Sequence, residues 1–168
     1  MKQIAIAFTG PSNSGKTTII EKISYALKDK IRVAIIKHDP KDKAIFDKEE
    51  KDSDKFFKSG ADVAVISPKK TTIFKHTTST IKEVAKCFKD YELLLVEGLK
   101  HLPLPRIAVF RGKVDKDYLP FIKAVAIDDT VDKKELEGTG VDILDLNNTQ
   151  EIIDYILKNA EEIDGKDI

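Results

Sequence analysis

The stretch Gly10-Pro-Ser-Asn-Ser-Gly15-Lys16-Thr17 decides the fold, because it fits the spacing G-x-x-x-x-G-K-[ST] of a phosphate-binding loop. The residues before it, 4–8, read Ile-Ala-Ile-Ala-Phe and suit a buried parallel strand. Residues 18–27 after it place apolar side chains on one helical face. A strand, a glycine loop and a helix in this order are the context that the motif requires. The sequence therefore predicts a protein that binds a nucleoside triphosphate.

Each part of this loop has a chemical task. Its glycines let the backbone approach a pyrophosphate, while the loop N–H groups and the helix N-terminus supply positive potential. Lys16 adds a charge for the β- and γ-phosphates, and the Thr17 hydroxyl can bind Mg²⁺. The residues expected to hold the triphosphate are Gly10, Pro11, Ser12, Asn13, Ser14, Gly15, Lys16, Thr17 and Thr18.

Composition narrows the class of protein. The chain is long enough for one nucleotide-binding domain, expected over residues 1–168. Its 29 basic and 29 acidic residues give no net field that would attract nucleic acid. No apolar run reaches the roughly 20 residues of a membrane span, and the start shows no cleavable signal. The single cysteine, Cys87, suits a reducing cytoplasm and is expected to be a small core residue.

Apolar strand patterns alternate with helical patterns along the chain. This alternation predicts an α/β protein, a P-loop fold of three layers with a mostly parallel central sheet and helices on both faces. Further strands are expected at 31–36, 62–67, 71–75 as an edge strand, 91–96, 106–110, 122–127 and 142–146. Further helices are expected at 52–60, capped by Asp52 or Ser53, at 80–88, and at 148–160, capped by Asn148 with Glu151. The charged segment 41–51 is expected to be a mobile loop that orders on ligand binding, or a solvated surface loop without a role.

Polar residues directly after the strands are the next candidates, because ligands of open α/β sheets bind at the carboxyl ends of the strands. Lys37 and His38 follow the second expected strand, and Lys100 follows the most apolar one. The two lysines would add positive charge where phosphates gather. His38 could donate to a phosphate, or it could make a structural hydrogen bond.

An acidic partner for Mg²⁺ is expected among Asp39, Asp52 and Glu97. Glu97 is the strongest candidate, because it ends a hydrophobic strand where a Walker-B carboxylate is found. Together with Lys16 it is the expected catalytic pair. Helix capping alone would explain Asp52, and Asp39 stands at a strand end before the charged loop. Thr17 completes the expected metal site.

Two patterns are missing. The Asn-Lys-x-Asp signature that reads guanine in many GTPases is absent, so the residues alone do not predict the base. Only three arginines occur, Arg32, Arg106 and Arg111, and none lies in the 41–51 segment. Nucleotide kinases use several arginines around the transferring phosphoryl group, so this scarcity argues against a kinase.

Three elements in combination resemble the molybdopterin-guanine dinucleotide biosynthesis protein B family. They are the phosphate loop, Val33-Ala-Ile-Ile-Lys37-His38-Asp39 and Leu94-Leu-Val-Glu97-Gly98-Leu99-Lys100, and the resemblance covers residues 3 to 111. It implies a homodimer that binds GTP with Mg²⁺, hydrolyses GTP weakly and acts as an adaptor in molybdenum cofactor biosynthesis. The implied partner is the molybdenum cofactor guanylyltransferase, with molybdopterin as a further candidate ligand.

The resemblance also implies which residues line the site: Lys37, His38, Asp39, Asp52, Glu97 and Lys100. The sequence departs from the family pattern in the charged loop. A second histidine and a proline–glycine pair of the family correspond here to residues 41–43 and to Glu49-Glu50. The role of residues 112–168 is not assigned.

Two alternatives stay open from the sequence. The Gly-Lys-Thr, Asp-Ser and Val-Glu-Gly elements are also similar to those of dethiobiotin synthetase, an ATP-dependent enzyme on a related fold. A metal-insertion GTPase is the other alternative, although such proteins usually show a clearer His/Cys cluster. The Ile-Lys-His-Asp element favours the first resemblance.

Overall fold

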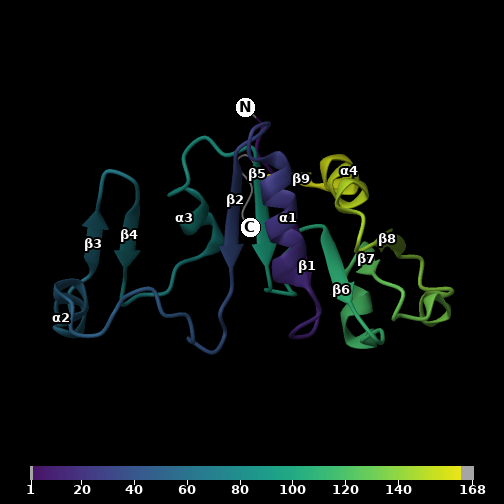
Figure 1. Cartoon of the computed structure of the whole chain (residues 1–168), viewed down its shortest axis with the longest axis horizontal. Coiled ribbons are helices and arrows are strands. Elements are labelled where there is room, and N and C mark those ends of the chain that lie inside the picture. The colour runs from purple at the N-terminus through teal and green to yellow at the C-terminus, as the bar shows by residue number, and fades with distance from the viewer. Residues whose placement is uncertain (1, 164–168) are drawn as a thin grey trace. The chain divides into compact units, whose positions relative to one another are not determined.

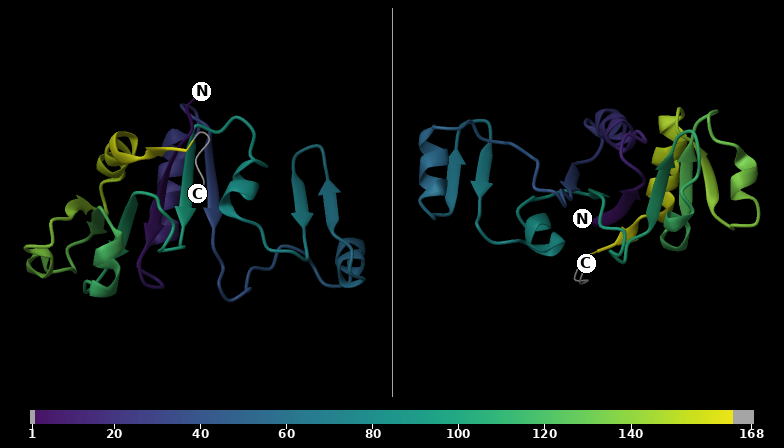
Figure 2. Two further views of the ribbon diagram at one scale, coloured as in Figure 1. Left: turned by 180° about the vertical axis from the view of Figure 1, so that it is seen from behind. Right: turned by 90° about the horizontal axis from the view of Figure 1, so that it is seen from below.

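The computed structural model describes residues 2–163, and the chain separates into two compact units (Figures 1 and 2). Residues 1–38 and 81–168 belong to the first unit, and residues 39–80 form the second. The organisation of residues 1–168 as a single domain stays a prediction.

The first unit is built on a seven-stranded sheet. Its strands are β1 (Ile4–Thr9), β2 (Val33–Lys37), β5 (Leu93–Glu97), β6 (Arg106–Phe110), β7 (Ala124–Ile127), β8 (Asp142–Asp145) and β9 (Glu161–Glu162). The order is β2-β5-β1-β6-β7-β8, all neighbours in this order are parallel, and β9 pairs antiparallel with β1. The mostly parallel sheet predicted from the sequence is therefore confirmed.

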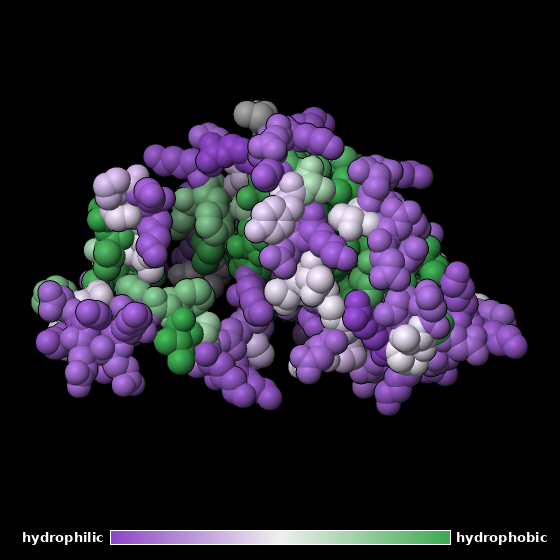
Figure 3. Space-filling view, in the orientation of Figure 1, coloured by the Kyte–Doolittle hydropathy of each residue, from purple (hydrophilic) through white to green (hydrophobic). Residues whose placement is uncertain are grey.

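The second unit contains a helix and a hairpin. Helix α2 (Asp52–Lys58) contacts β3 (Val63–Ile66), which pairs antiparallel with β4 (Thr71–Phe74). These two strands were expected in the main sheet, but they form a two-stranded sheet of their own. Most of their side chains are exposed, including Ile66 at 79%, and Figure 3 shows apolar surface over this hairpin. Residues 41–51 contain no helix or strand, as expected, and their mobility stays a prediction.

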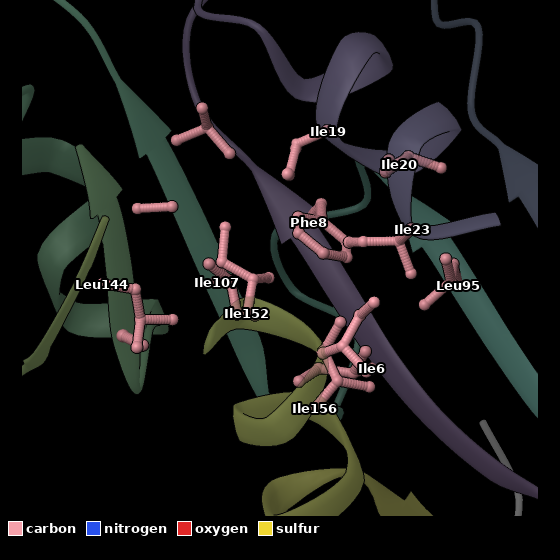
Figure 4. Packing of buried hydrophobic residues seen from close by; sticks show 14 of the residues in the cluster. Ile6, Phe8, Ile19, Ile20, Ile23, Leu95, Ile107, Leu144, Ile152 and Ile156 are labelled. Atoms are coloured by element: carbon pink, nitrogen blue, oxygen red, sulfur yellow. The ribbon is translucent and has the colours of Figure 1, made fainter. Parts of the chain in front are cut away.

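Alternation along β1 explains how the sheet of the first unit is covered on both faces. Ile6 and Phe8 point toward α1 (Lys16–Leu27) and α4 (Thr149–Asn159), where they pack with Ile19, Ile23 and Ile156 in one buried cluster (Figure 4). The alternate residues of β1, 5 and 7, join a second cluster that includes residues of the short helix α3 (Ile81–Ala85). Helices therefore lie on both faces, as predicted.

The predicted capping residue of α4 is correct, and those of α2 are wrong. The Asn148 side chain accepts a hydrogen bond from the Glu151 N–H at 3.2 Å, which confirms the expected cap of α4. Neither Asp52 nor Ser53 caps α2, because both residues already lie within the helix, which begins at Asp52. Lys51 occupies the cap position without a side-chain bond.

Cys87 is exposed, so its interpretation as a core residue is wrong. Helix α3 has five residues and ends at Ala85, two residues before the cysteine, so the helical face that would have buried it does not extend that far. Within the part of the chain that the structure describes, no helix has the length and apolar character needed to cross a membrane.

Candidate functional site

The phosphate loop lies at the carboxyl end of β1, where it passes very close to β6. Gly10 has a φ of +133°, and a Cβ at this position would lie 2.4 Å from the Val109 carbonyl oxygen. Any side chain would therefore force the loop and β6 apart. The motif needs glycine here both for the backbone conformation and for the space beside the neighbouring strand.

Two polar groups of the loop, the Lys16 ammonium and the Ser14 hydroxyl, could bind an anion. The Lys16 ammonium donates to the carbonyl oxygens of Gly10 at 2.9 Å and Pro11 at 2.6 Å. The Ser14 hydroxyl is buried and has no hydrogen-bond partner among residues 2–163. A buried hydroxyl without a partner is costly, so a ligand oxygen within its reach would be stabilising. The residues of the loop therefore fit a polyphosphate.

Glu97 and Lys37 lie beside this loop at the same edge of the sheet. They face each other in the register of β2 and β5, and Glu97 pairs with Phe8 of β1 in the same register. Their charged atoms, Lys37 Nζ and Glu97 Oε2, are 3.7 Å apart, with Glu97 only 13% exposed. Burial lowers the pKa of Lys16. The nearby charge of Glu97 raises this pKa, and the nearby charge of Lys37 lowers it further. Lys16, Lys37 and Glu97 thus form one electrostatic cluster, and their roles toward phosphate and Mg²⁺ stay predictions.

His38 is held beside the residue that follows Glu97. Its N–H donates to the Glu97 carbonyl at 3.0 Å, and its Cβ lies 3.2 Å from where a Cβ of Gly98 would be. Gly98 has a φ of +96° and donates its N–H to the Phe8 carbonyl at 2.9 Å. The glycine lets the chain turn at the end of β5 and leaves room for the His38 side chain beside it.

Lys100 makes a contact that the sequence did not predict. Its ammonium lies 5.5 Å from the ring centroid of Phe121, and the ring of His101 packs edge-on against the same phenylalanine. These residues line a pocket of about 460 Å³ together with Pro103 and Pro105. A place for Lys100 at the phosphates stays a prediction.

Asp39 and Asp52 belong to the second unit. The Asp39 carboxylate accepts hydrogen bonds from the N–H groups of Lys41, Lys43 and Ala44, at 3.2, 2.6 and 2.7 Å, and so shapes the start of the charged loop. Asp52 is the exposed first residue of α2. A role of either residue as a ligand of Mg²⁺ stays a prediction.

Among the described residues, no three His, Cys, Asp or Glu side chains are grouped so that they could hold a metal ion by themselves. Mg²⁺ in nucleotide sites is held by one or two protein oxygens, the phosphates and water. Thr17, exposed at the start of α1, and Glu97, at the end of β5, are the residues here that suit this mode.

Two functional candidates were missed by the sequence reasoning, Arg111 after β6 and Asp128 after β7. The Arg111 guanidinium lies beside the phosphate loop, 3.4 to 3.6 Å from where a Cβ of Gly15 would be, and its Nε is 3.2 Å from Asp128 Oδ2. Asp128 also lines a pocket of about 510 Å³ at the ends of β7 and β8. The rule that selected Lys37 and Glu97, a polar residue after a buried strand, applies equally to both and would have found them.

A third missed residue, Arg106, supports the loop that follows Glu97. Its guanidinium is buried and donates to the carbonyls of Gly98 at 2.8 Å, Leu99 at 2.7 Å and Leu102 at 3.1 Å. Burial lowers the pKa of this arginine. The sequence indicated only a strand residue at this position, because which carbonyls surround a side chain depends on the tertiary fold.

Comparison with known proteins decides the family. The sequence model of molybdopterin guanine dinucleotide synthesis protein B matches residues 5–128. The chain belongs to this family. It is 32% identical over 161 residues to the molybdopterin-guanine dinucleotide biosynthesis adapter protein of Haemophilus influenzae, covering 90% of this chain and 86% of that protein. The adapter protein of Escherichia coli is 27% identical over 171 residues, covering 95% of each.

Solved structures agree with this assignment. A crystal structure of molybdopterin-guanine biosynthesis protein B (mobB) superposes with a TM-score of 0.69 at 26% identity, covering 92% of this chain and 99% of that one. Bacillus subtilis MobB shares the fold, with a TM-score of 0.72 at 20% identity over 94% of this chain and 98% of that one. The hydrogenase maturation factor HypB of Archaeoglobus fulgidus shares it more distantly, with a TM-score of 0.54 at 16% identity, 92% coverage of this chain and 88% of that one.

Membership of the MobB family decides between the resemblances that the sequence left open. It confirms the first one and favours neither dethiobiotin synthetase nor a metal-insertion GTPase. The family match also extends through β6 and β7 to Asp128, whereas the resemblance in the sequence ended at Arg111. Arg111, Asp128 and the phosphate loop therefore all lie within the matched region.

Replacing Gly10 by alanine should destabilise the first unit more than the same change at Gly138. Both glycines have positive φ, but a Cβ meets the Val109 carbonyl at Gly10 and nothing within 4 Å at Gly138. Backbone strain costs each variant about 1–2 kcal/mol, and overpacking adds about 1–3 kcal/mol at Gly10 alone. Urea unfolding of Gly10→Ala and Gly138→Ala measures this difference, and equal losses of stability would contradict the close approach of the loop to β6.

Proposed function

We propose that this protein is a cytoplasmic, GTP-binding adapter in molybdopterin guanine dinucleotide biosynthesis. The observation that carries the proposal is the phosphate loop, with Lys16 and a buried, unpartnered Ser14 hydroxyl, in a chain of the MobB family. Relatives covered over most of their length are named as adapter proteins of this pathway. The nucleotide would bind with its phosphates on the loop, and Lys16 would leave the carbonyls of Gly10 and Pro11 for phosphate oxygens.

Guanine is the base that the pocket beyond Asp128 favours. The pocket is lined by carboxylates, among them Asp129, Asp145 and Glu151. Ionised carboxylates only accept hydrogen bonds, and guanine offers donors at N1 and N2 of its Watson–Crick edge, where adenine presents an acceptor at N1. The Arg111–Asp128 pair joins this pocket to the loop, since Arg111 also lies beside Gly15. A nucleotide with its phosphates on the loop could therefore place its base in the pocket.

Mg²⁺ would be held by Thr17 and, directly or through water, by Glu97. Bound there, the ion neutralises charge on the β- and γ-phosphates. Glu97 is mostly buried and paired with Lys37, so its carboxylate is already oriented at the edge of the sheet. Weak hydrolysis of GTP at this site is part of the proposal.

A homodimer is supported by the second unit. The segment before its helix, the helix and the hairpin all expose large apolar side chains: Ile45, Phe46, Phe56, Val65, Ile66 and Ile73. Exposed apolar side chains gathered on one small unit indicate an interaction surface. A second copy of the chain is the partner that we propose for it.

The guanylyltransferase that joins GMP to molybdopterin is the proposed partner of the adapter, and molybdopterin is the proposed further ligand. The names of the relatives place them in this pathway. An adapter that holds GTP would deliver one of the two substrates of the guanylyltransferase.

Lys16→Ala should weaken GTP binding by roughly a hundredfold or more, because it removes the charge that contacts two phosphates. Lys22→Ala, an exposed lysine on the same helix, should bind GTP like the wild type. Titration calorimetry with GTP and ATP measures both effects, and the wild type should prefer GTP. Unchanged GTP affinity in Lys16→Ala, or a preference for ATP, would contradict the proposal.

Glu97→Gln should slow Mg²⁺-dependent GTP hydrolysis by roughly tenfold or more while changing GTP affinity less, since the loop amides hold phosphate without the metal. Single-turnover assays with and without Mg²⁺ separate the two quantities. Equal turnover by the variant and the wild type would remove Glu97 from the mechanism.

Assembly provides the test of the adapter role. Wild-type protein should have the mass of two chains by light scattering, and when immobilised it should retain purified molybdenum cofactor guanylyltransferase. Lys16→Ala with GTP present serves as the matched control for a dependence on nucleotide. A monomer would contradict the dimer, and a failure to retain the guanylyltransferase under both conditions would contradict the adapter.

A further inference from the structure

Arg111 stands next to the turn of the phosphate loop. It directly follows β6, which is paired with β1, the strand that leads into the loop. Its Nε, Cζ and Nη2 atoms lie 3.4, 3.6 and 3.6 Å from the position of a Cβ on Gly15. The flat guanidinium therefore lies over the space that a side chain at Gly15 would fill. An alanine at Gly15 would press against this arginine.

The orientation of Arg111 is fixed from one side only. Its Nε pairs with Asp128 Oδ2 at 3.2 Å, and its terminal NH₂ groups have no hydrogen-bond partner among residues 2–163. The side chain is 49% exposed, so it is open to solvent beside the loop. A guanidinium held through Nε presents its remaining donors as a planar fork, which matches two oxygens of a phosphate.

Asp128 is itself held in place. Its Oδ1 accepts hydrogen bonds from the N–H of Thr130, at 3.1 Å, and from the Thr130 hydroxyl. The same hydroxyl oxygen accepts the N–H of Gly112 at 2.8 Å, which ties the segment after β6 to the segment after β7. The hydrogen bonds from Thr130 lower the pKa of Asp128, with a smaller contribution from Arg111, so the carboxylate stays ionised at neutral pH.

Arg111 is the arginine of this chain that a polyphosphate on the loop can reach. Arg106 is buried and donates to three carbonyls. Arg32 precedes β2, at the opposite edge of the sheet from the loop, and pairs with Asp90 at 3.6 Å. The pairing of Arg111 with Asp128 is partly exposed and adds little to stability, so a purely structural role does not explain why the fork is aimed at the loop.

We propose that Arg111 is a nucleotide-contacting residue, which binds phosphate oxygens of a nucleoside di- or triphosphate on the loop, and that Asp128 is the positioning residue that aims it. The proposal rests on the proposed nucleotide binding and extends it to a residue outside the loop. Arg111 adds a charge-assisted, two-pronged contact that Lys16, a point charge, does not provide.

The test compares GDP and GTP affinities of Arg111→Gln, Arg111→Lys and the control Arg32→Gln by titration calorimetry, in the full chain with Mg²⁺. Arg111→Gln should weaken both affinities by roughly tenfold or more, as expected for the loss of hydrogen bonds to charged groups. Arg111→Lys should recover part of the loss, because it keeps the charge without the fork. Arg32→Gln, which also removes an exposed paired arginine, should bind like the wild type.

Two further readouts separate a phosphate contact from a structural brace. The affinity of the wild type should fall more steeply with salt than that of Arg111→Gln, because one ionic contact is gone in the variant. The loss caused by Arg111→Gln should shrink in an Asp128→Asn background, since Arg111 is no longer aimed there. Thermal unfolding of each variant reports whether the fold is kept.

The results that overturn the proposal are distinct. Affinities of Arg111→Gln equal to those of Arg32→Gln, together with lost binding in Lys16→Ala, would overturn the role of Arg111 and leave the proposed function intact. If Arg111→Gln lowered the affinity by the same factor in the Asp128→Asn background as in the wild type, the positioning role of Asp128 would be overturned. Wild-type protein that bound no guanine nucleotide would overturn both the proposed function and this extension of it.

Discussion

The close approach of the backbone after β1 to the end of β6 is the constraint on which the candidate site depends. Gly10 lies where a Cβ would meet the Val109 carbonyl, so the loop and the neighbouring strand share one narrow space. Because β5, β1 and β6 are parallel neighbours, their carboxyl ends deliver Glu97, the loop and Arg111 to the same edge. Packing of alternate residues on both faces of β1 fixes this edge. The arrangement of the strands therefore determines where the loop and its charged neighbours lie.

Charge at this edge is arranged in pairs that a polyphosphate would complete. Lys37 faces Glu97, Arg111 faces Asp128, and Lys16 rests on backbone carbonyls. Each cation is held in place by a weak or partial partner, so little stabilisation is lost when it turns to a phosphate. Glu97 at the end of β5 and Arg111 after β6 lie on the two strands that neighbour β1, which leads into the loop. Such preorganisation suits a protein that holds a nucleotide for a partner, because binding needs no large rearrangement.

The sequence was sufficient for the parallel sheet, the loop, the cap of α4 and the placement of Lys37 and Glu97 at one edge of the sheet, since these follow from local patterns and from the shared carboxyl edge of parallel strands. It was not sufficient for the hairpin β3–β4, because apolar strands four residues long look alike in a main sheet and in a separate one. Cys87 was misplaced because the length of α3 depends on tertiary packing. Arg111 and Asp128 could have been selected as polar residues after buried strands, but their pairing could not, because it depends on the adjacency of β6 and β7 in the folded sheet.

The central claim is that the main-chain amides of the loop and the Lys16 ammonium enclose the phosphates of a guanine nucleotide. A crystal structure with a non-hydrolysable GTP analogue and Mg²⁺ measures this directly. The account predicts the β-phosphate on the amides that precede α1, with Lys16 Nζ moved from the carbonyls of Gly10 and Pro11 to phosphate oxygens. A nucleotide bound elsewhere, with Lys16 still on those carbonyls, would contradict it.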